Sequence, residues 1–235
     1  MKLNQSFSVR LSLYVIIATS VLCIGGLVGA EIFSVKELNK SLAKDAAEVL
    51  EVQIKDVENV LIEVESATKN MSWVVKEHAD DAGFMFHLSE KLLVNNQNII
   101  GTAVAFEPFY FPSEGKWFAP YSSFDSDGKV FSYQCGTEEY NYFDLDWYRL
   151  PKSRNSSMWM DPYYDEDNAA HGLCPYLTTY SVPLQDENGK VFAIIQSDVS
   201  LQTITDKLSS LEGYEHSYSV LLGRYGAFLS HPDSS

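Results

Sequence analysis

Residues 43–75 read AKDAAEVLEVQIKDVENVLIEVESATKNMSWVV, and apolar residues recur there at alternating spacings of four and three. The positions of this ladder are Ala43, Ala47, Leu50, Ile54, Val57, Leu61, Val64, Thr68, Met71 and Val75, of which only Thr68 is polar. Residues 31–82 contain neither glycine nor proline. The pattern therefore predicts one long amphipathic helix. Its apolar stripe can pack on the chain's own sheet or against a second copy, and we expect both, which predicts a homodimer.

An uncharged segment, LSLYVIIATSVLCIGGLVGA at residues 11–30, precedes this helix. Twenty helical residues span about 30 Å, the thickness of a bilayer's hydrocarbon core. Lys2 and Arg10 come before the segment, and Glu31 follows it. This charge bias predicts a cytoplasmic tail at residues 1–10, a transmembrane helix at 11–30, and residues 31–235 outside the bacterial cytoplasmic (inner) membrane. A cleaved signal peptide ending near Ala30 is the alternative, but its apolar region would be unusually long, and it exports the same residues.

The charge of the chain narrows the choice of partners. The sequence has 17 basic and 32 acidic residues, a net charge of −15. Residues 1–30 hold two bases and no acid, so the exported part carries −17. Such a surface repels phosphate, and we expect no nucleic-acid partner. Export would permit a disulfide between Cys135 and Cys174, with two separate thiols as the alternative; Cys23 lies in the apolar segment.

The periodicity changes after Gly83. A second helix is expected at Phe84–Val94, ending at the Asn95-Asn96 pair. Hairpin turns are expected at residues 125–128 and 186–189. Strands are expected at 99–106, 117–124, 130–135, 177–184, 191–199, 218–222 and 228–230, and helices at 142–152 and 200–211. The fold class is therefore α+β, with the membrane helix continuing into the long helix and then an antiparallel sheet.

The last expected hairpin, at residues 218–230, starts a unit that two strands cannot complete. No second apolar segment follows to return the chain to the cytoplasm. We therefore expect the sequence to be a fragment of a longer protein.

Four stretches carry a resemblance to a known family, in this order along the chain. They are NIIGTAVAFEP at 98–108, DWY at 146–148, WMDPY at 159–163, and residues 180–201, which contain YSVPL, NGK and QSDVSL. Together with the anchor and long helix, they resemble the double Cache (PDC-like) sensor domain of bacterial transmembrane receptors. The resemblance implies that residues 31–212 form the long helix and a membrane-distal, PAS-like Cache lobe, and that residues 213–235 begin a membrane-proximal lobe. It implies extracytoplasmic small-molecule sensing and signal transduction for a histidine kinase, serine phosphatase, cyclase or chemotaxis output, with the kinase and phosphatase classes favoured.

The resemblance also suggests a ligand site. Trp147 and Tyr148 would face the sheet from a short helix, and Asp198 matches the carboxylate that receives a ligand ammonium. Amino-acid-binding members have an arginine two residues before the tryptophan, but this chain has Leu145. The departure argues against an amino acid and leaves an amine-bearing or polyol ligand, unless Arg149 or Arg154 replaces the missing arginine.

Other interpretations of these residues remain open. Trp147 and Tyr148 can be core residues, and Asp198 can cap the helix that starts near Ser200. Further ligand-binding candidates, which can equally pack loops, are Trp159, Asp161, Tyr163 and Tyr176.

The sequence offers little for catalysis or metal binding. It has no nucleophile, zinc or phosphate-loop motif, and we expect no enzyme, metal or cofactor. Residues 125–128 read as a turn rather than a calcium loop. Asp165-Glu166-Asp167 with His171 could hold a divalent cation, but a solvated loop is favoured. The alternatives to a sensor are a pilin-like assembly protein, which normally has a glutamate in its apolar segment, and an anchored extracytoplasmic enzyme.

Overall fold

The computed structural model describes residues 7–209, 220–223, 226 and 228–230, in two compact units, Met1–Val52 and Gln53–Ser235. A single helix, α1 (Phe7–Glu77), runs through the first unit and into the second. In the first unit its side chains are almost all exposed, including the apolar ones of the uncharged segment. By length and composition alone, this helix can cross a membrane. The long helix predicted from the apolar ladder is thus confirmed.

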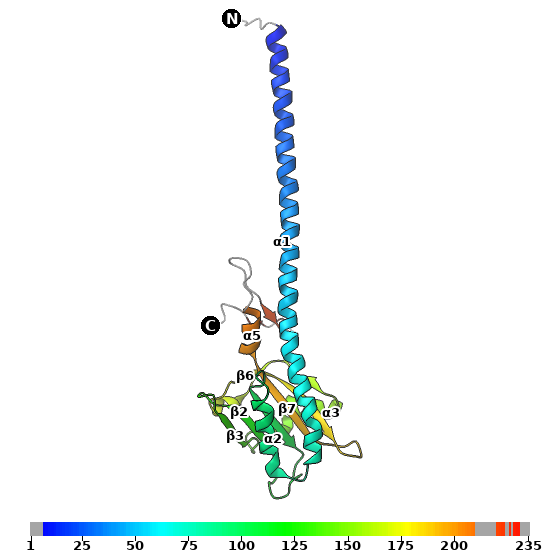
Figure 1. Ribbon diagram of the computed structural model, residues 1–235, viewed down its shortest axis with the longest axis vertical. Coiled ribbons are helices and arrows are strands. Elements are labelled where there is room, and N and C mark those ends of the chain that lie inside the picture. Colours follow the sequence, from blue (N-terminus) through cyan, green and yellow to red (C-terminus); the bar gives the residue numbers. More distant parts are fainter. Residues whose placement is uncertain (1–6, 210–219, 224–225, 227, 231–235) are drawn as a thin grey trace. The chain divides into compact units, whose positions relative to one another are not determined.

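The second unit is built on an antiparallel sheet of seven strands (Figure 1). The strand order is β3-β2-β1-β7-β6-β4, and β5 also pairs with β6. The strands are β1 (Gly101–Phe106), β2 (Pro120–Phe124), β3 (Val130–Gln134), β4 (Met158–Trp159), β5 (Tyr163–Tyr164), β6 (Tyr176–Gln185) and β7 (Val191–Ser200). β1 and β7 lie at the centre of the sheet, and every residue of both strands is buried. The α+β class and both hairpins agree with the sequence prediction.

The C-terminal part of α1 and helix α2 (Ala82–Val94) pack on one face of the sheet (Figure 1). Val64 and Val75 of the apolar ladder are buried there, as is the neighbouring Val60, so the C-terminal half of the ladder packs on the chain's own sheet. α2 begins two residues before its predicted start because Asp81 caps it, accepting a hydrogen bond from the Phe84 N–H at 3.0 Å.

Short helices pack on the opposite face, where a second core lies around Tyr142, Trp147 and Tyr148. They are the 3₁₀ helix η1 (Tyr142–Asp144), α3 (Asp146–Arg154) and α4 (Glu166–Ala170). Gly136 has φ +107°, and a Cβ there would overlap the Tyr142 ring, so only glycine fits. The sequence did not predict β4, β5 or α4.

The chain continues through α5 (Leu201–Ser209) to a separate pair of strands, β8 (Leu221–Leu222) and β9 (Phe228–Ser230). Parts of the expected helix at 200–211 and strand at 218–222 fall outside the described residues. All three cysteines are free, with Cys135 buried and Cys174 exposed. The sequence alternative of two separate thiols, rather than a disulfide, therefore holds in this structure.

Candidate ligand-binding site

A small cavity lies between the sheet and the segments that cover its second face, and we call it the acidic cavity. The volume that is accessible to the centre of a water molecule is only about 10 Å³, which is roughly the room needed for one water. Its lining is polar and aromatic, and among these described residues there is no lysine, arginine or histidine. The lining residues are Ala103, Tyr121, Tyr133, Cys135, Tyr140, Trp147, Tyr163, Asp165, Asp167, Asn168, Gln196 and Asp198.

Asp198 lies on the sheet floor of the acidic cavity and is 2% exposed. Its carboxylate accepts hydrogen bonds from the Thr179 hydroxyl at 2.6 Å, the Tyr121 hydroxyl at 3.1 Å and the Gln196 amide at 3.3 Å. Burial raises the pKa of Asp198 to about 7, and the nearby negative charge of Asp165 adds to the rise. The three hydrogen bonds lower the pKa of Asp198, but the effect of burial is larger, so the charged carboxylate is poorly stabilised. A cation beside this carboxylate would therefore be strongly favoured.

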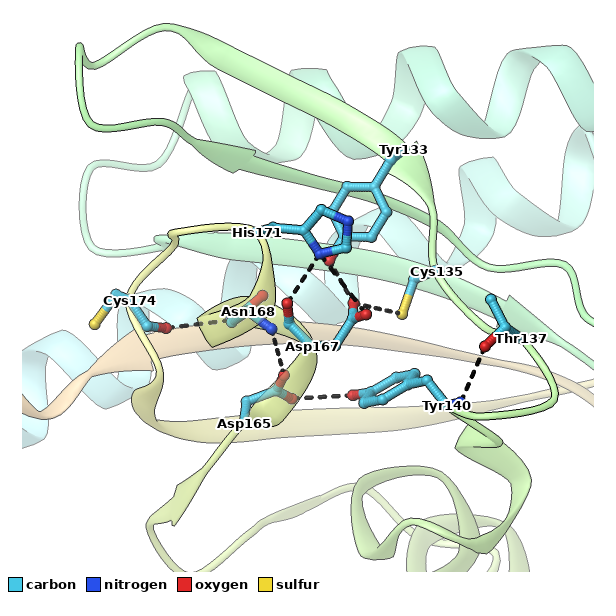
Figure 2. A network of polar contacts seen from close by, with 9 residues as sticks. All are labelled: Tyr133, Cys135, Thr137, Tyr140, Asp165, Asp167, Asn168, His171 and Cys174. Carbon is cyan, nitrogen blue, oxygen red and sulfur yellow. Dashed lines mark hydrogen bonds and ion pairs between the residues drawn. The ribbon is translucent and has the colours of Figure 1, made fainter.

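Two further carboxylates enter the acidic cavity from α4 and the residue before it (Figure 2). Asp165 caps α4 by accepting the Asn168 N–H at 2.8 Å, and its other oxygen accepts the Tyr140 hydroxyl at 3.0 Å. Asp167 accepts the Tyr133 hydroxyl at 2.5 Å. Burial raises the pKa of Asp165 above its usual range. The solvated loop favoured for this acidic run is therefore wrong, because the segment folds back over the sheet.

Three of the sequence candidates share this cavity: Trp147 of α3, Tyr163 of β5 and Asp198 of β7. Tyr163 contacts the Thr179 hydroxyl at 2.8 Å, and Thr179 bonds Asp198. Tyr148 is buried beside the cavity but donates its hydroxyl to Glu107 rather than lining the space. Asp198 does not cap α5, since the Ser200 hydroxyl accepts the Gln202 N–H.

The remaining candidates lie elsewhere. Trp159 pairs with Tyr180 across β4 and β6 and donates its indole N–H to Glu65 of α1, which places it on the opposite face of the sheet. Asp161 is exposed. Tyr176 is 59% exposed and packs against Tyr164. Arg149, a proposed replacement for the missing arginine, pairs with Asp146 on the surface.

The sequence did not single out Tyr121, Tyr133, Tyr140 or Gln196 as site residues, and it offered Asp165 and Asp167 only as a less favoured cation site, although all six line the cavity. One signal was available for Gln196. It stands two residues before Asp198 in a strand, and alternation puts both on the same face. Tyr121 and Tyr133 are cross-strand partners, so they also share a face. Nothing in the sequence showed which face that would be.

The sequence itself matches a known family. The model described as "Methyl-accepting chemotaxis protein-like, first PDC sensor domain" covers residues 87–206, just over half of the chain. The chain belongs to this PDC sensor family. It is accordingly a sensor domain of the kind found in methyl-accepting chemotaxis protein-like receptors. No curated protein matches the sequence significantly.

Solved structures share the PDC fold. The extracellular domain assigned to histidine kinase soHK1S-Z6 aligns with a TM-score of 0.64 at 22% identity, covering 81% of this chain and 72% of that one. The periplasmic sensory domain of the Campylobacter jejuni chemoreceptor Tlp1 gives 0.61 at 16%, covering 77% and 69%. The ligand-binding domain of Pseudomonas aeruginosa PctB, in complex with L-Arg, gives 0.56 at 18%, covering 81% and 71%.

Proposed function

We propose that this PDC domain is the sensor part of a bacterial transmembrane receptor and that it binds an amine-bearing small molecule in the acidic cavity. The observation that carries the proposal is the lining itself, in which three carboxylates and several aromatic rings surround one small cavity without a basic side chain among the lining residues. Ligand sites commonly combine apolar walls with a few aimed polar groups. A polyol would leave the carboxylates unneutralised, so an amine suits the lining better.

The ligand is expected to lack a carboxylate. The related PctB and PctC domains have been solved with L-Arg and GABA, which carry an amine and a carboxylate together. In this chain Leu145 stands where the resemblance places a carboxylate-clamping arginine, and Arg149 is paired on the surface. A ligand carboxylate would therefore meet Asp165 and Asp167, with no lysine, arginine or histidine among the residues that line the cavity.

Signal transfer would pass from β7 to α1. Asp198 faces the acidic cavity, and the preceding residue, Ser197, faces α1 because side chains alternate along a strand. The buried Thr68 hydroxyl donates to Ser197 Oγ at 2.8 Å, and the Gln53 amide of α1 donates to the Leu208 carbonyl of α5 at 2.5 Å. A ligand that prefers one position of β7 would shift the equilibrium by its differential affinity.

The receptor around this domain is also part of the proposal. Residues 11–30 would anchor it in the inner membrane, residues 31–212 would form the membrane-distal Cache lobe, and residues from 213 would begin a second lobe. The output would be a histidine kinase or serine phosphatase, with no catalysis in this chain. Leu50 and Ile54 of the apolar ladder are half exposed, which supports a homodimer through α1. A Leu50→Cys variant would then cross-link to its copy, and its failure to do so would count against that dimer.

The sensing claim can be tested by thermal unfolding of the full chain in detergent, with amines, amino acids and polyols as the ligand panel. We expect amines to raise the melting temperature of the wild type and not that of Asp198→Asn. Glu166→Gln, an exposed acid on α4, is the matched control and should retain the response. If no compound raises the melting temperature, or if Asp198→Asn responds like the wild type, the proposed site is refuted.

A further inference from the structure

The acidic cavity contains more hydrogen-bond acceptors than its own donors satisfy. Gln196 is 4% exposed, and its Oε1 is one of two buried side-chain polar atoms without a hydrogen-bond partner among the described residues. Its amide nitrogen is already used on Asp198. A buried acceptor left unpaired costs stability, so a ligand that brings N–H donors to this point would be favoured.

Each carboxylate in the acidic cavity is bonded by a tyrosine hydroxyl. Tyr121 serves Asp198, Tyr133 serves Asp167, and Tyr140 serves Asp165. Burial raises the pKa of all three tyrosines, so they remain protonated donors. Neutral donors satisfy the geometry of a carboxylate but leave its charge in place. Asp167 also has the His171 imidazole beside it, with Nδ1 3.7 Å from Asp167 Oδ1, although His171 does not line the cavity.

The acceptors fall into two groups on different elements. Asp198 and Gln196 stand on β7, in the sheet floor. Asp165 and Asp167 belong to the N-terminal end of α4, in the cover. Figure 2 shows Asp165 pointing toward Tyr140, and Asp167 pointing toward Tyr133 and His171.

We infer that the acidic cavity takes an organic dication, with one ammonium held by Asp198 and Gln196 and the second by Asp165 and Asp167. This inference rests on the proposed sensor function and adds the second subsite on α4. An ammonium has three N–H donors and no acceptor, so it matches both groups, including the unpaired Gln196 oxygen. A divalent metal ion fits less well, because no group of three or more described His, Cys, Asp or Glu side chains could hold one.

The size of the cavity sets how the ligand enters. With room for about one water, the cavity admits a ligand only if tyrosine side chains move aside. Each ammonium N–H then replaces a tyrosine O–H on the same carboxylate, so no acceptor loses its donor. The exchange also brings positive charge next to buried negative charge, which strengthens the bonds.

The test uses four compounds of nearly equal length on the full chain in detergent: 1,4-diaminobutane, butylamine, 4-aminobutanoate and 1,4-butanediol. Affinity is measured by calorimetry and by the rise in melting temperature. We expect 1,4-diaminobutane to bind roughly tenfold or more tightly than butylamine, since hydrogen bonds to charged groups exceed neutral ones. We expect 4-aminobutanoate to bind more weakly than butylamine, because its carboxylate would face Asp165 and Asp167.

Variants separate the two subsites. The double variant Asp165→Asn with Asp167→Asn should lower the affinity for 1,4-diaminobutane at least tenfold more than the affinity for butylamine, so that the two compounds bind about equally. Asn can still cap α4, so the fold should survive; if the double variant melts early, Asp167→Asn alone is used. Asp198→Asn should weaken both amines, and Glu166→Gln should weaken neither.

The outcomes distinguish this inference from the function on which it rests. Equal binding of 1,4-diaminobutane and butylamine, or no effect of the α4 variants, overturns the second subsite while sensing of amines stands. Tighter binding of 4-aminobutanoate than of either amine also overturns it. If none of the four compounds binds, the dication is refuted. The proposed function is refuted separately, by failure of the whole ligand panel or by an Asp198→Asn variant that responds like the wild type.

Discussion

Replacing Asp198 with asparagine should make the protein more stable at pH 8 and remove part of its pH dependence. Asp198 is 2% exposed, and its hydrogen-bonding partners among the described residues, Thr179, Tyr121 and Gln196, are all neutral. Burial raises its pKa from 3.8 to about 7, so the folded state penalises the charged form. The folded protein therefore binds this proton more tightly than the unfolded chain does, and stability falls as pH rises from about 4 to about 7.

The magnitude follows from the size of the shift. A rise of roughly three pKa units corresponds to roughly 4 kcal/mol, at about 1.4 kcal/mol per unit. Asparagine has nearly the same shape and never ionises, and its oxygen can still accept the Thr179 hydroxyl. We expect Asp198→Asn to match the wild type near pH 4 and to exceed it by up to roughly 4 kcal/mol near pH 8.

Urea unfolding of the full chain in detergent, followed by tryptophan fluorescence across this pH range, measures the difference directly. Asp127→Asn is the control, because Asp127 lies in an exposed turn where its ion pair with Lys129 spans 3.8 Å. Asp165, whose pKa burial also raises, is present in both proteins, so the comparison mainly reports Asp198. A difference that does not change with pH, or an asparagine variant that is less stable at pH 8, would refute the reasoning.

Three further predictions test the packing around the cavity. Thr68→Val should lower the free energy of unfolding, measured with urea, by about 1–3 kcal/mol, because it leaves the Ser197 hydroxyl buried without its partner. Adding Ser197→Ala should restore part of this loss, whereas additive losses from the two substitutions would contradict the hydrogen bond. Gly101→Ala should weaken amine binding in calorimetry, because the new Cβ would overlap the Tyr121 hydroxyl and approach Asp198; unchanged affinity would argue against this pair as a ligand contact. Exposed Cys174 should react with a maleimide in the folded protein, whereas Cys135 should react only after unfolding, because it is buried and burial raises the pKa of its thiol. Equal labelling of the two cysteines in the folded protein, read by mass spectrometry, would contradict the packing.

The elements that the sequence predicts well are those with a long periodic pattern. The apolar ladder locates α1, and the turns at 125–128 and 186–189 locate two hairpins, because local spacing determines these elements. β4, β5 and α4 are two to five residues long, too short to show a period. Their positions depend on pairing with β6 and on the cap at Asp165, which are tertiary contacts.

The same limit explains the errors at the site. The run Asp165-Glu166-Asp167 has the composition of a solvated loop, yet Asp165 is buried because its N–H bonds the Pro175 carbonyl at 2.8 Å and its side chain caps α4. Trp159 belongs to a stretch that resembles the family's site region, yet its register against Tyr180 turns it toward Glu65 of α1. In both cases the residue types were informative, but the face each side chain uses was decided by its strand partner or cap.

Thr68 shows how a departure from a pattern can carry structural information. A valine there would complete the apolar ladder, and a buried hydroxyl without a partner would be costly. The structure supplies the partner, since Thr68 donates to Ser197 and lies 2.7 Å from the Val64 carbonyl. Ser197 stands next to Asp198 in β7, so the one polar position of the ladder contacts the strand that forms the cavity floor. A polar residue at this place in α1 gives the helix a directional bond to β7 that apolar packing would not provide.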